Sequence, residues 1–178
     1  MDIGLLIIRI VVGALFIGHG TQKLFGWFGG RGLEGTGGFF ASLGYRPPTV
    51  MAGLAGIAEA GGGLLLALGF VTPLAAAAIV GVMTSAALAV HARHGLWNTQ
   101  GGFELPLVDA TVVTAVAFIG PGRFSLDHLL GWNLAGVPWG VGAFALGFLS
   151  ASALNQWRAA PAPRAVPAPE ASDERKAA

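Results

Sequence analysis

The sequence has no cysteine and few charged residues, and both features restrict the class of protein to which it can belong. Without cysteine the chain can form no disulfide, thiol redox centre, cysteine-ligated iron–sulfur cluster or thiolate zinc site. Only 11% of its 178 residues are charged, whereas 54% are hydrophobic; an ordinary soluble domain has about 25% charged residues. We therefore expect a multi-helix membrane protein whose main partner is the lipid bilayer. The net charge of +1 indicates no nucleic-acid partner.

Five apolar stretches set the expected fold, and each reaches the lower limit of about 17 residues for a spanning helix. They cover residues 3–24, 49–70, 73–94, 103–119 and 137–154. This pattern predicts an all-α membrane protein with a four-helix transmembrane bundle core in residues 1–128. A linker and a fifth C-terminal transmembrane helix follow in 129–157, and an interfacial helix is the alternative for this segment. Residues 158–178 are rich in alanine, proline and charge, so we expect a disordered tail.

Proline and glycine mark the expected helix ends. Pro73 and Pro138 are expected at the starts of their helices, because a proline inside a helix removes a hydrogen bond. The first apolar stretch is not a signal peptide, because no basic residue precedes it and Arg9 interrupts it. The glycine-rich residues 26–38 lack the strand–turn–helix context of a phosphate-binding motif, so we expect a flexible loop there.

The distribution of Lys and Arg predicts the orientation. With alternating spans, the side opposite the N-terminus carries Lys23, Arg31, Arg46 and Arg93, and with five spans also the basic tail. The amino-terminal side carries only Arg9 and Arg123. Cytoplasmic loops are enriched in Lys and Arg, so five spans place the N-terminus outside and the C-terminus in the cytoplasm.

Two charged residues lie deep in the expected spans, where a lone charge is costly. Arg9 is about two turns into the first span, and Glu59 is near the middle of the second. Small residues share a helical face with Glu59, so the simplest prediction packs these two helices together with an Arg9–Glu59 ion pair. Such a pair is either a structural salt bridge or a midplane site for a proton or a substrate head group.

A second set of polar residues converges near the predicted cytoplasmic face. It comes from three spans and consists of His19, Lys23, His91, His94, Glu104 and Asp109. Quinone carbonyls need donors such as His, Lys or Arg with a carboxylate nearby to manage protons, so this set is a candidate head-group site. The alternative is that these side chains reach from the interface to water.

Metal and haem sites are disfavoured. His91 and His94 have a spacing suitable for a metal pair, but no Glu-x-x-His element accompanies them, so we predict no metal site. A haem would need His19 and His91 on facing helix surfaces, and two histidines at one depth are weak support for it. We expect no intrinsic cofactor, with a quinone as the candidate ligand.

The order of several motifs resembles the DoxX family of integral membrane proteins. The resemblance covers residues 3–128 and includes Arg9, the run Phe16-Ile-Gly-His19-Gly-Thr-Gln-Lys23-Leu-Phe25, the run Thr36-Gly-Gly-Phe-Phe-Ala-Ser-Leu-Gly44, Ala58-Glu59, His91, Gly101-Gly-Phe-Glu104 and Gly120-Pro-Gly-Arg-Phe-Ser-Leu-Asp127.

This resemblance implies a four-helix membrane core related to proteins associated with thiosulfate:quinone oxidoreductase and terminal quinol oxidase complexes. The matching site positions are Arg9, His19, Lys23, Glu59, His91 and Glu104, whereas Asp109 comes only from its depth. We expect an accessory or small subunit of a quinone-linked redox system in the bacterial cytoplasmic membrane, rather than a self-contained enzyme. Its partners would be membrane or cytoplasmic redox subunits. The alternative is a non-enzymatic assembly factor or small-solute transporter.

Overall fold

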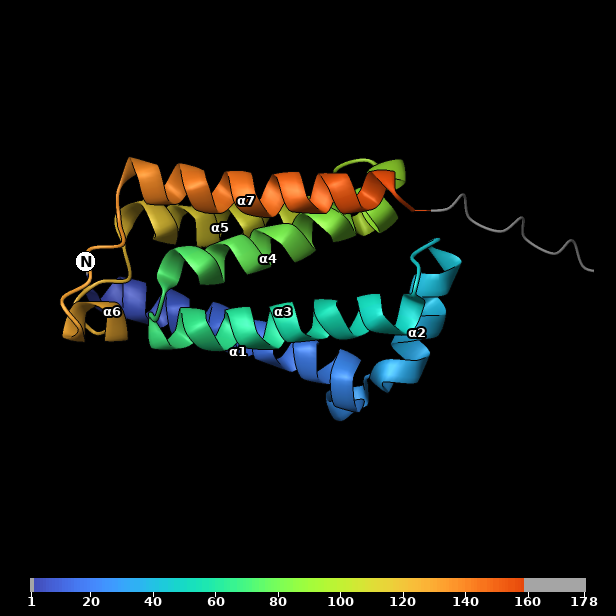
Figure 1. Cartoon of the computed structure of the whole chain (residues 1–178), viewed down its shortest axis with the longest axis horizontal. Coiled ribbons are helices and arrows are strands. Elements are labelled where there is room, and N and C mark those ends of the chain that lie inside the picture. The colour runs from blue at the N-terminus through green and yellow to red at the C-terminus, as the bar shows by residue number, and fades with distance from the viewer. Residues whose placement is uncertain (1, 159–178) are drawn as a thin grey trace, which may run out of the picture.

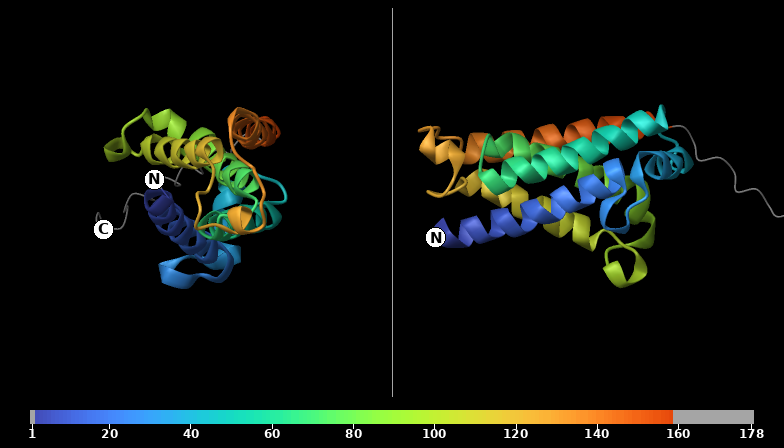
Figure 2. Two further views of the ribbon diagram at one scale, coloured as in Figure 1. Left: turned by 90° about the vertical axis from the view of Figure 1, so that its left-hand side faces the viewer. Right: turned by 90° about the horizontal axis from the view of Figure 1, so that it is seen from below.

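The computed structural model describes residues 2–158, and this range is built from helices and their connections without any strand. Five long helices run back and forth between two ends of the molecule (Figures 1 and 2). They are α1 (Asp2–Phe25), α3 (Pro48–Leu68), α4 (Thr72–Ala86), α5 (Glu104–Ile119) and α7 (Val137–Gln156). The predicted disordered tail lies, apart from Arg158, outside the described residues.

Two short helices mark the ends of the bundle. Helix α2 (Gly32–Ser42) lies at the end where α1 finishes, which we call the α2 end. Helix α6 (Leu126–Leu129) lies at the opposite end beside the N-terminus, which we call the α6 end (Figure 1).

The length and apolar composition of the helices account for the small number of charged residues in the sequence. Four segments of the described chain could cross a membrane by length and composition: Asp2–Phe25, Pro48–Leu68, Thr72–His94 and Val137–Gln156. Helix α5 has 16 residues, or about 24 Å, and packs beside α4 and α7. The predicted all-α membrane fold is confirmed. Helix α7 meets the spanning criterion, and Pro138 lies in its first turn as expected.

Helix α4 joins the two halves of the bundle. Helix α1 packs on α3, while α5 and α7 pack on α4, and α4 in turn packs on α3. The buried core contains small and branched side chains of α4, such as Ala76, Ile79 and Val80, that let its neighbours approach closely.

Glycines produce the crossing of α1 and α3, as their shared small-residue face predicts. A Cβ at Gly13 would lie 2.6 Å from the Gly63 carbonyl oxygen. A Cβ at Gly20 would meet the backbone of Gly56 and Ala60. The two backbones therefore touch, and this close packing replaces the hydrophobic driving force that a lipid environment lacks.

The expectation of a flexible loop over residues 26–38 is wrong in its second half, because α2 begins at Gly32. This helix packs on α3, and its residues Thr36 and Gly37 are buried. A Cβ at Gly37 would lie 3.0 Å from the Thr49 hydroxyl oxygen, so glycine permits this contact. Tertiary packing thus outweighs the poor helix propensity of the glycines.

Candidate functional site

Glu59 forms an ion pair with Lys23, and not with Arg9 as predicted. The Lys23 Nζ lies 2.5 Å from Glu59 Oε2, and the Glu59 side chain is only 3% exposed. The antiparallel register explains this choice: Gly20 crosses α3 beside Ala60, so Lys23, one turn later, lies over Glu59. The Lys23 side chain is 26% exposed, so the pair lies at the edge of the buried core.

Arg9 instead binds backbone at the α6 end. Because Gly13 meets Gly63, the preceding turn of α1 lies beside the last turn of α3. The buried guanidinium donates to four carbonyl oxygens, those of Leu66, Ala67, Pro121 and Phe124. Arg9 thereby satisfies carbonyls at the C-terminus of α3 and in the connection from α5 to α6. It joins three parts of the fold, and it does not belong to the same site as Glu59.

Asp127 performs the complementary task at the start of α4. Its buried carboxylate accepts hydrogen bonds from the backbone N–H groups of Val71 and Thr72, at 2.7 and 3.0 Å. It also accepts one from the Thr72 hydroxyl at 2.7 Å. A carboxylate at this position satisfies free N–H groups and interacts favourably with the helix dipole. Sequence reasoning included Asp127 only as part of a motif and assigned it no role.

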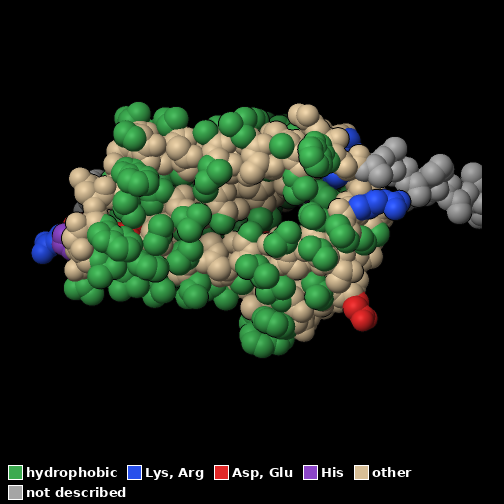
Figure 3. Space-filling view, in the orientation of Figure 1, with side chains coloured by type: hydrophobic (Ala, Val, Ile, Leu, Met, Phe, Trp, Pro, Cys, Tyr) green, Lys and Arg blue, Asp and Glu red, His purple; other side chains and the backbone are tan. Residues whose placement is uncertain are grey.

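A cavity of about 490 Å³ lies beside the Lys23–Glu59 pair. Its walls come from the end of α1, α2 and the connection that follows it, α3, α4 and its extension, and α7, and most of the lining side chains are apolar. Figure 3 shows this side of the molecule hollowed between the α3 and α7 layers, toward the α2 end. Pockets of about 300–1,000 Å³ with mostly apolar walls and a few polar groups are typical of small-molecule sites.

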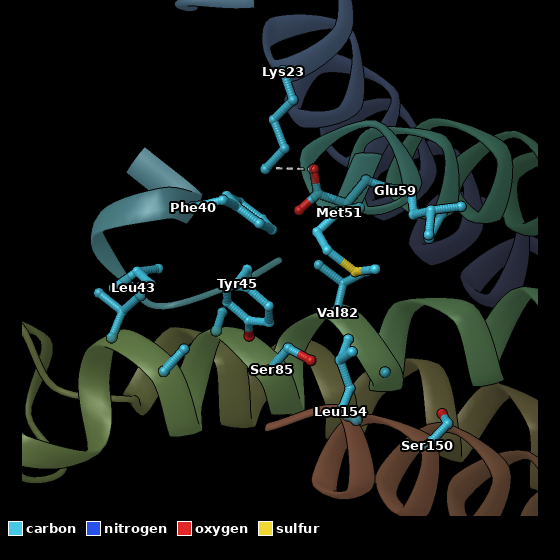
Figure 4. A pocket seen from close by; sticks show the side chains of 18 of the residues that line it. Lys23, Phe40, Leu43, Tyr45, Met51, Glu59, Val82, Ser85, Ser150 and Leu154 are labelled. Atoms are coloured by element: carbon cyan, nitrogen blue, oxygen red, sulfur yellow. Dashed lines mark hydrogen bonds and ion pairs between the residues drawn. The ribbon is translucent and has the colours of Figure 1, made fainter. Parts of the chain in front are cut away.

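Three predicted site residues line this cavity, namely Lys23, Glu59 and His91. The Glu59 carboxylate and the Lys23 ammonium lie together on one side of it (Figure 4). They are the only charged groups among its lining residues in the described chain, apart from His91 when that residue is protonated. The structure thus brings together part of each of the two predicted constellations.

The other predicted residues lie elsewhere. Arg9 is at the α6 end, as described above. His19 is exposed, and its Nδ1 lies 3.2 Å from Gln22 Oε1. Glu104 accepts a hydrogen bond from the Asn98 backbone N–H at 2.8 Å and so holds the connection before α5. Asp109 is half-buried on α5, within electrostatic range of His19 but outside the cavity.

His91 ends an irregular part of the third apolar segment. After α4 the chain forms a π-helical turn, Ala87–His91, and then a 3₁₀ turn, Ala92–His94. The His91 Nδ1 lies 2.7 Å from the Gly101 carbonyl oxygen, which can only accept, so Nδ1 carries a proton. In the neutral ring Nε2 is then an acceptor. Single π-helical turns are frequent at functional sites, and the sequence contained no signal for this one.

Sequence reasoning missed a polar network at the α2 end of the cavity. Buried Tyr45 donates to Asn155 Oδ1 at 3.2 Å, and Asn155 Nδ2 donates to Ser85 Oγ at 3.3 Å. Burial raises the pKa of the Tyr45 hydroxyl, so this group is a neutral donor at physiological pH. Two features of the sequence could have indicated this network. Tyr45 is the only tyrosine of the chain, and Asn155 is a polar residue in a mostly apolar helix.

Arg158 adds two contacts at the same end of the cavity. Its guanidinium lies 5.4 Å from the centre of the Tyr45 ring and donates to the Leu43 carbonyl oxygen at 3.1 Å. The connection between α2 and α3 is therefore tied to the end of α7. These contacts lie at the α2 end of the cavity, while the hollow between α3 and α7 opens on the side of the bundle that Figure 3 shows.

The described residues contain no group of three or more His, Asp or Glu side chains that could hold a metal ion. The two histidines considered for haem, His19 and His91, do not share a site. His91 lines the cavity, whereas His19 does not.

The comparisons with known proteins identify the family. The model of the DoxX family matches residues 4–92, which is half of the chain and includes Lys23, Tyr45, Glu59, Ser85 and His91. The match is shorter than the stretch over which the motifs resemble that family. No curated protein and no solved structure matches the chain. The chain therefore belongs to the DoxX family, as its motifs predicted.

Proposed function

We propose that this protein binds a lipid-soluble quinone or quinol in its cavity, as an accessory or small subunit of a quinone-linked membrane redox system. The observation that carries the proposal is the Lys23–Glu59 pair at the wall of an otherwise mostly apolar cavity near the middle of α3. A paired cation and carboxylate offer a donor and a proton acceptor beside a space that suits a hydrophobic ring.

The chemistry of the pair fits a quinone oxygen. An ammonium has three N–H donors, and Glu59 engages one of them, so Lys23 can donate to a carbonyl oxygen of the ring. Reduction of a quinone takes up two electrons and two protons. Glu59 and His91 are the lining groups suited to exchange those protons with the ring oxygens. The electrons come from a partner subunit, since the sequence lacks cysteine for a thiol or iron–sulfur centre.

The position of the opening also supports a lipid-soluble ligand. The contacts of Tyr45, Asn155 and Arg158 lie at the α2 end, whereas the hollow between α3 and α7 faces the side of the bundle. Exposed apolar side chains such as Leu54 on α3 and Leu154 on α7 are at the rim of this cavity and continue its surface outward. A molecule with a long apolar tail can enter from the bilayer and leave its tail there.

The proposal predicts that the purified full chain retains quinone. Lipid extracts of the wild-type protein are expected to contain quinone at a substantial molar fraction, measured by liquid chromatography and mass spectrometry. A matched preparation of the Lys23→Met variant should contain several-fold less. Absence of quinone from the wild type, together with stable capture of another membrane subunit, would instead favour an assembly factor.

We also propose that the α2 end faces the bacterial cytoplasm. Arg31, Arg46, Arg93 and Arg158 belong to segments at this end, whereas Arg123 precedes α6 at the other end. Because basic loops remain in the cytoplasm, this places the N-terminus outside.

The lack of native cysteine makes the orientation directly measurable. A single cysteine introduced at exposed Glu34 should resist a membrane-impermeant maleimide in intact cells. One introduced at exposed Leu129 should react. After permeabilisation both should react, and the reverse pattern in intact cells would overturn the orientation.

A further inference from the structure

Polar groups lie on two opposite sides of the cavity. Figure 4 shows Lys23 and Glu59 on one side and Ser85 on the other, with Phe40 and Met51 lying between these levels. The Phe40 ring packs against the Tyr45 ring, with 5.0 Å between their centres. The space between the two polar sides is thus flanked by an aromatic pair and a flexible apolar side chain, surfaces suited to the faces of a flat ring.

Ser85 differs from three hydroxyl residues of the neighbouring helices α5 and α7. The hydroxyls of Thr111, Thr114 and Ser150 each donate to the carbonyl four residues earlier, at 2.7 Å. In the described part of the chain, no backbone carbonyl accepts from Ser85, whose oxygen instead accepts from Asn155. Its hydrogen is free to turn between the neighbouring Tyr45 hydroxyl and the cavity.

The network behind Ser85 occupies its oxygen as an acceptor. The Tyr45 hydroxyl donates to Asn155 Oδ1, which fixes the amide so that its nitrogen points at Ser85. Because Ser85 already accepts from Asn155, and the Tyr45 hydrogen is used on Asn155, the Ser85 hydrogen can be donated to the Tyr45 oxygen or to an acceptor in the cavity. Lys23 on the opposite side is also a donor. The cavity therefore presents two donors that face each other across a slot.

We propose that the cavity selects a flat ring with acceptor oxygens on two opposite edges, and that Ser85 is the specificity-determining donor for the second oxygen. A 1,4-dione has this arrangement, with one oxygen toward Lys23 and the other toward Ser85. This inference rests on the proposed quinone-binding function and deepens it, because it assigns the ring orientation and the residue that distinguishes a dione from a monoketone.

The test compares two probes with the purified full chain in detergent. One is 2-methyl-1,4-naphthoquinone, which has both carbonyls, and the other is 1-tetralone, which has a similar bicyclic frame and one carbonyl. The Ser85→Ala variant is expected to bind the dione about three- to tenfold more weakly, the loss of one neutral hydrogen bond. Its affinity for the monoketone should not change.

Thr111→Ala is the matched control, because Thr111 lies outside the cavity on α5 and donates to the Leu107 carbonyl oxygen of its own helix. It should leave both affinities unchanged, and thermal unfolding of both variants checks that the fold is intact. Equal affinity of wild type and Ser85→Ala for the dione would overturn this inference alone. Failure of the wild type to bind the dione would overturn the proposed function as well.

Discussion

Replacing Arg9 with leucine is expected to destabilise the protein by at least about 3 kcal/mol. The change removes a buried guanidinium that donates to the carbonyls of Leu66, Ala67, Pro121 and Phe124. These acceptors lie at the end of α3 and in the connection to α6, where leucine offers no donor. The measurement is thermal or denaturant unfolding of the purified protein in detergent.

Arg123→Leu is the control for this prediction. Arg123 belongs to the same connection but is exposed, so its replacement should change the free energy of unfolding by no more than about 0.5 kcal/mol. Arg9→Lys should retain part of the stability, because an ammonium has fewer donors than a guanidinium and lacks its planar shape. An Arg9→Leu variant that unfolds like the wild type but no longer binds quinone would contradict the structural role and return Arg9 to the site.

Replacing Lys23 with methionine is expected to weaken quinone binding by about ten- to hundredfold. Methionine has a similar length and no charge, so the variant loses a charge-assisted hydrogen bond worth about 1.5–3 kcal/mol to the ring oxygen. It also leaves the buried Glu59 carboxylate without its partner. Breaking a buried ion pair from one side costs about 3–5 kcal/mol of stability. Binding is measured by titration with 2-methyl-1,4-naphthoquinone, and stability by unfolding.

The double variant Lys23→Met/Glu59→Gln separates these two effects. Two neutral side chains remove the unpaired charge, so stability should recover toward that of the wild type, whereas quinone affinity should stay low. Arg46→Met, a change at an exposed cation near the same end, should alter neither quantity. Recovery of affinity in the double variant would show that the pair only holds α1 against α3.

The ends of single helices largely follow from local chemistry. Pro48, Pro73 and Pro138 lie in the first turns of their helices, because proline lacks the N–H that these turns leave free. Gly69 ends α3 with a positive φ of 61°, which suits a residue without a side chain. Helix α2 was missed because its glycines indicate a loop, and only its packing on α3 makes it helical.

The candidate site was predicted less completely, because its geometry depends on which residues of neighbouring helices lie at the same level. Lys23, Glu59 and His91 were recognised as polar residues at membrane depth, but Glu59 was given the wrong partner. A shift of about ten residues along α1 separates Arg9 from the level of Glu59, and single-helix periodicity cannot measure that shift. Ser85, Tyr45 and Asn155 come from three separate segments and form a network only after folding.

The amino-acid sequence alone determined that this is a helical membrane protein, since the scarcity of charge and the apolar stretches leave no other way to satisfy its backbone and side chains. It also determined that α1 and α3 meet through small residues, because those residues share one helical face. Only the tertiary structure decided which charges pair and where a cavity remains. Those outcomes depend on backbone contacts such as Gly20 with Ala60, which fix the level at which each side chain meets its neighbour.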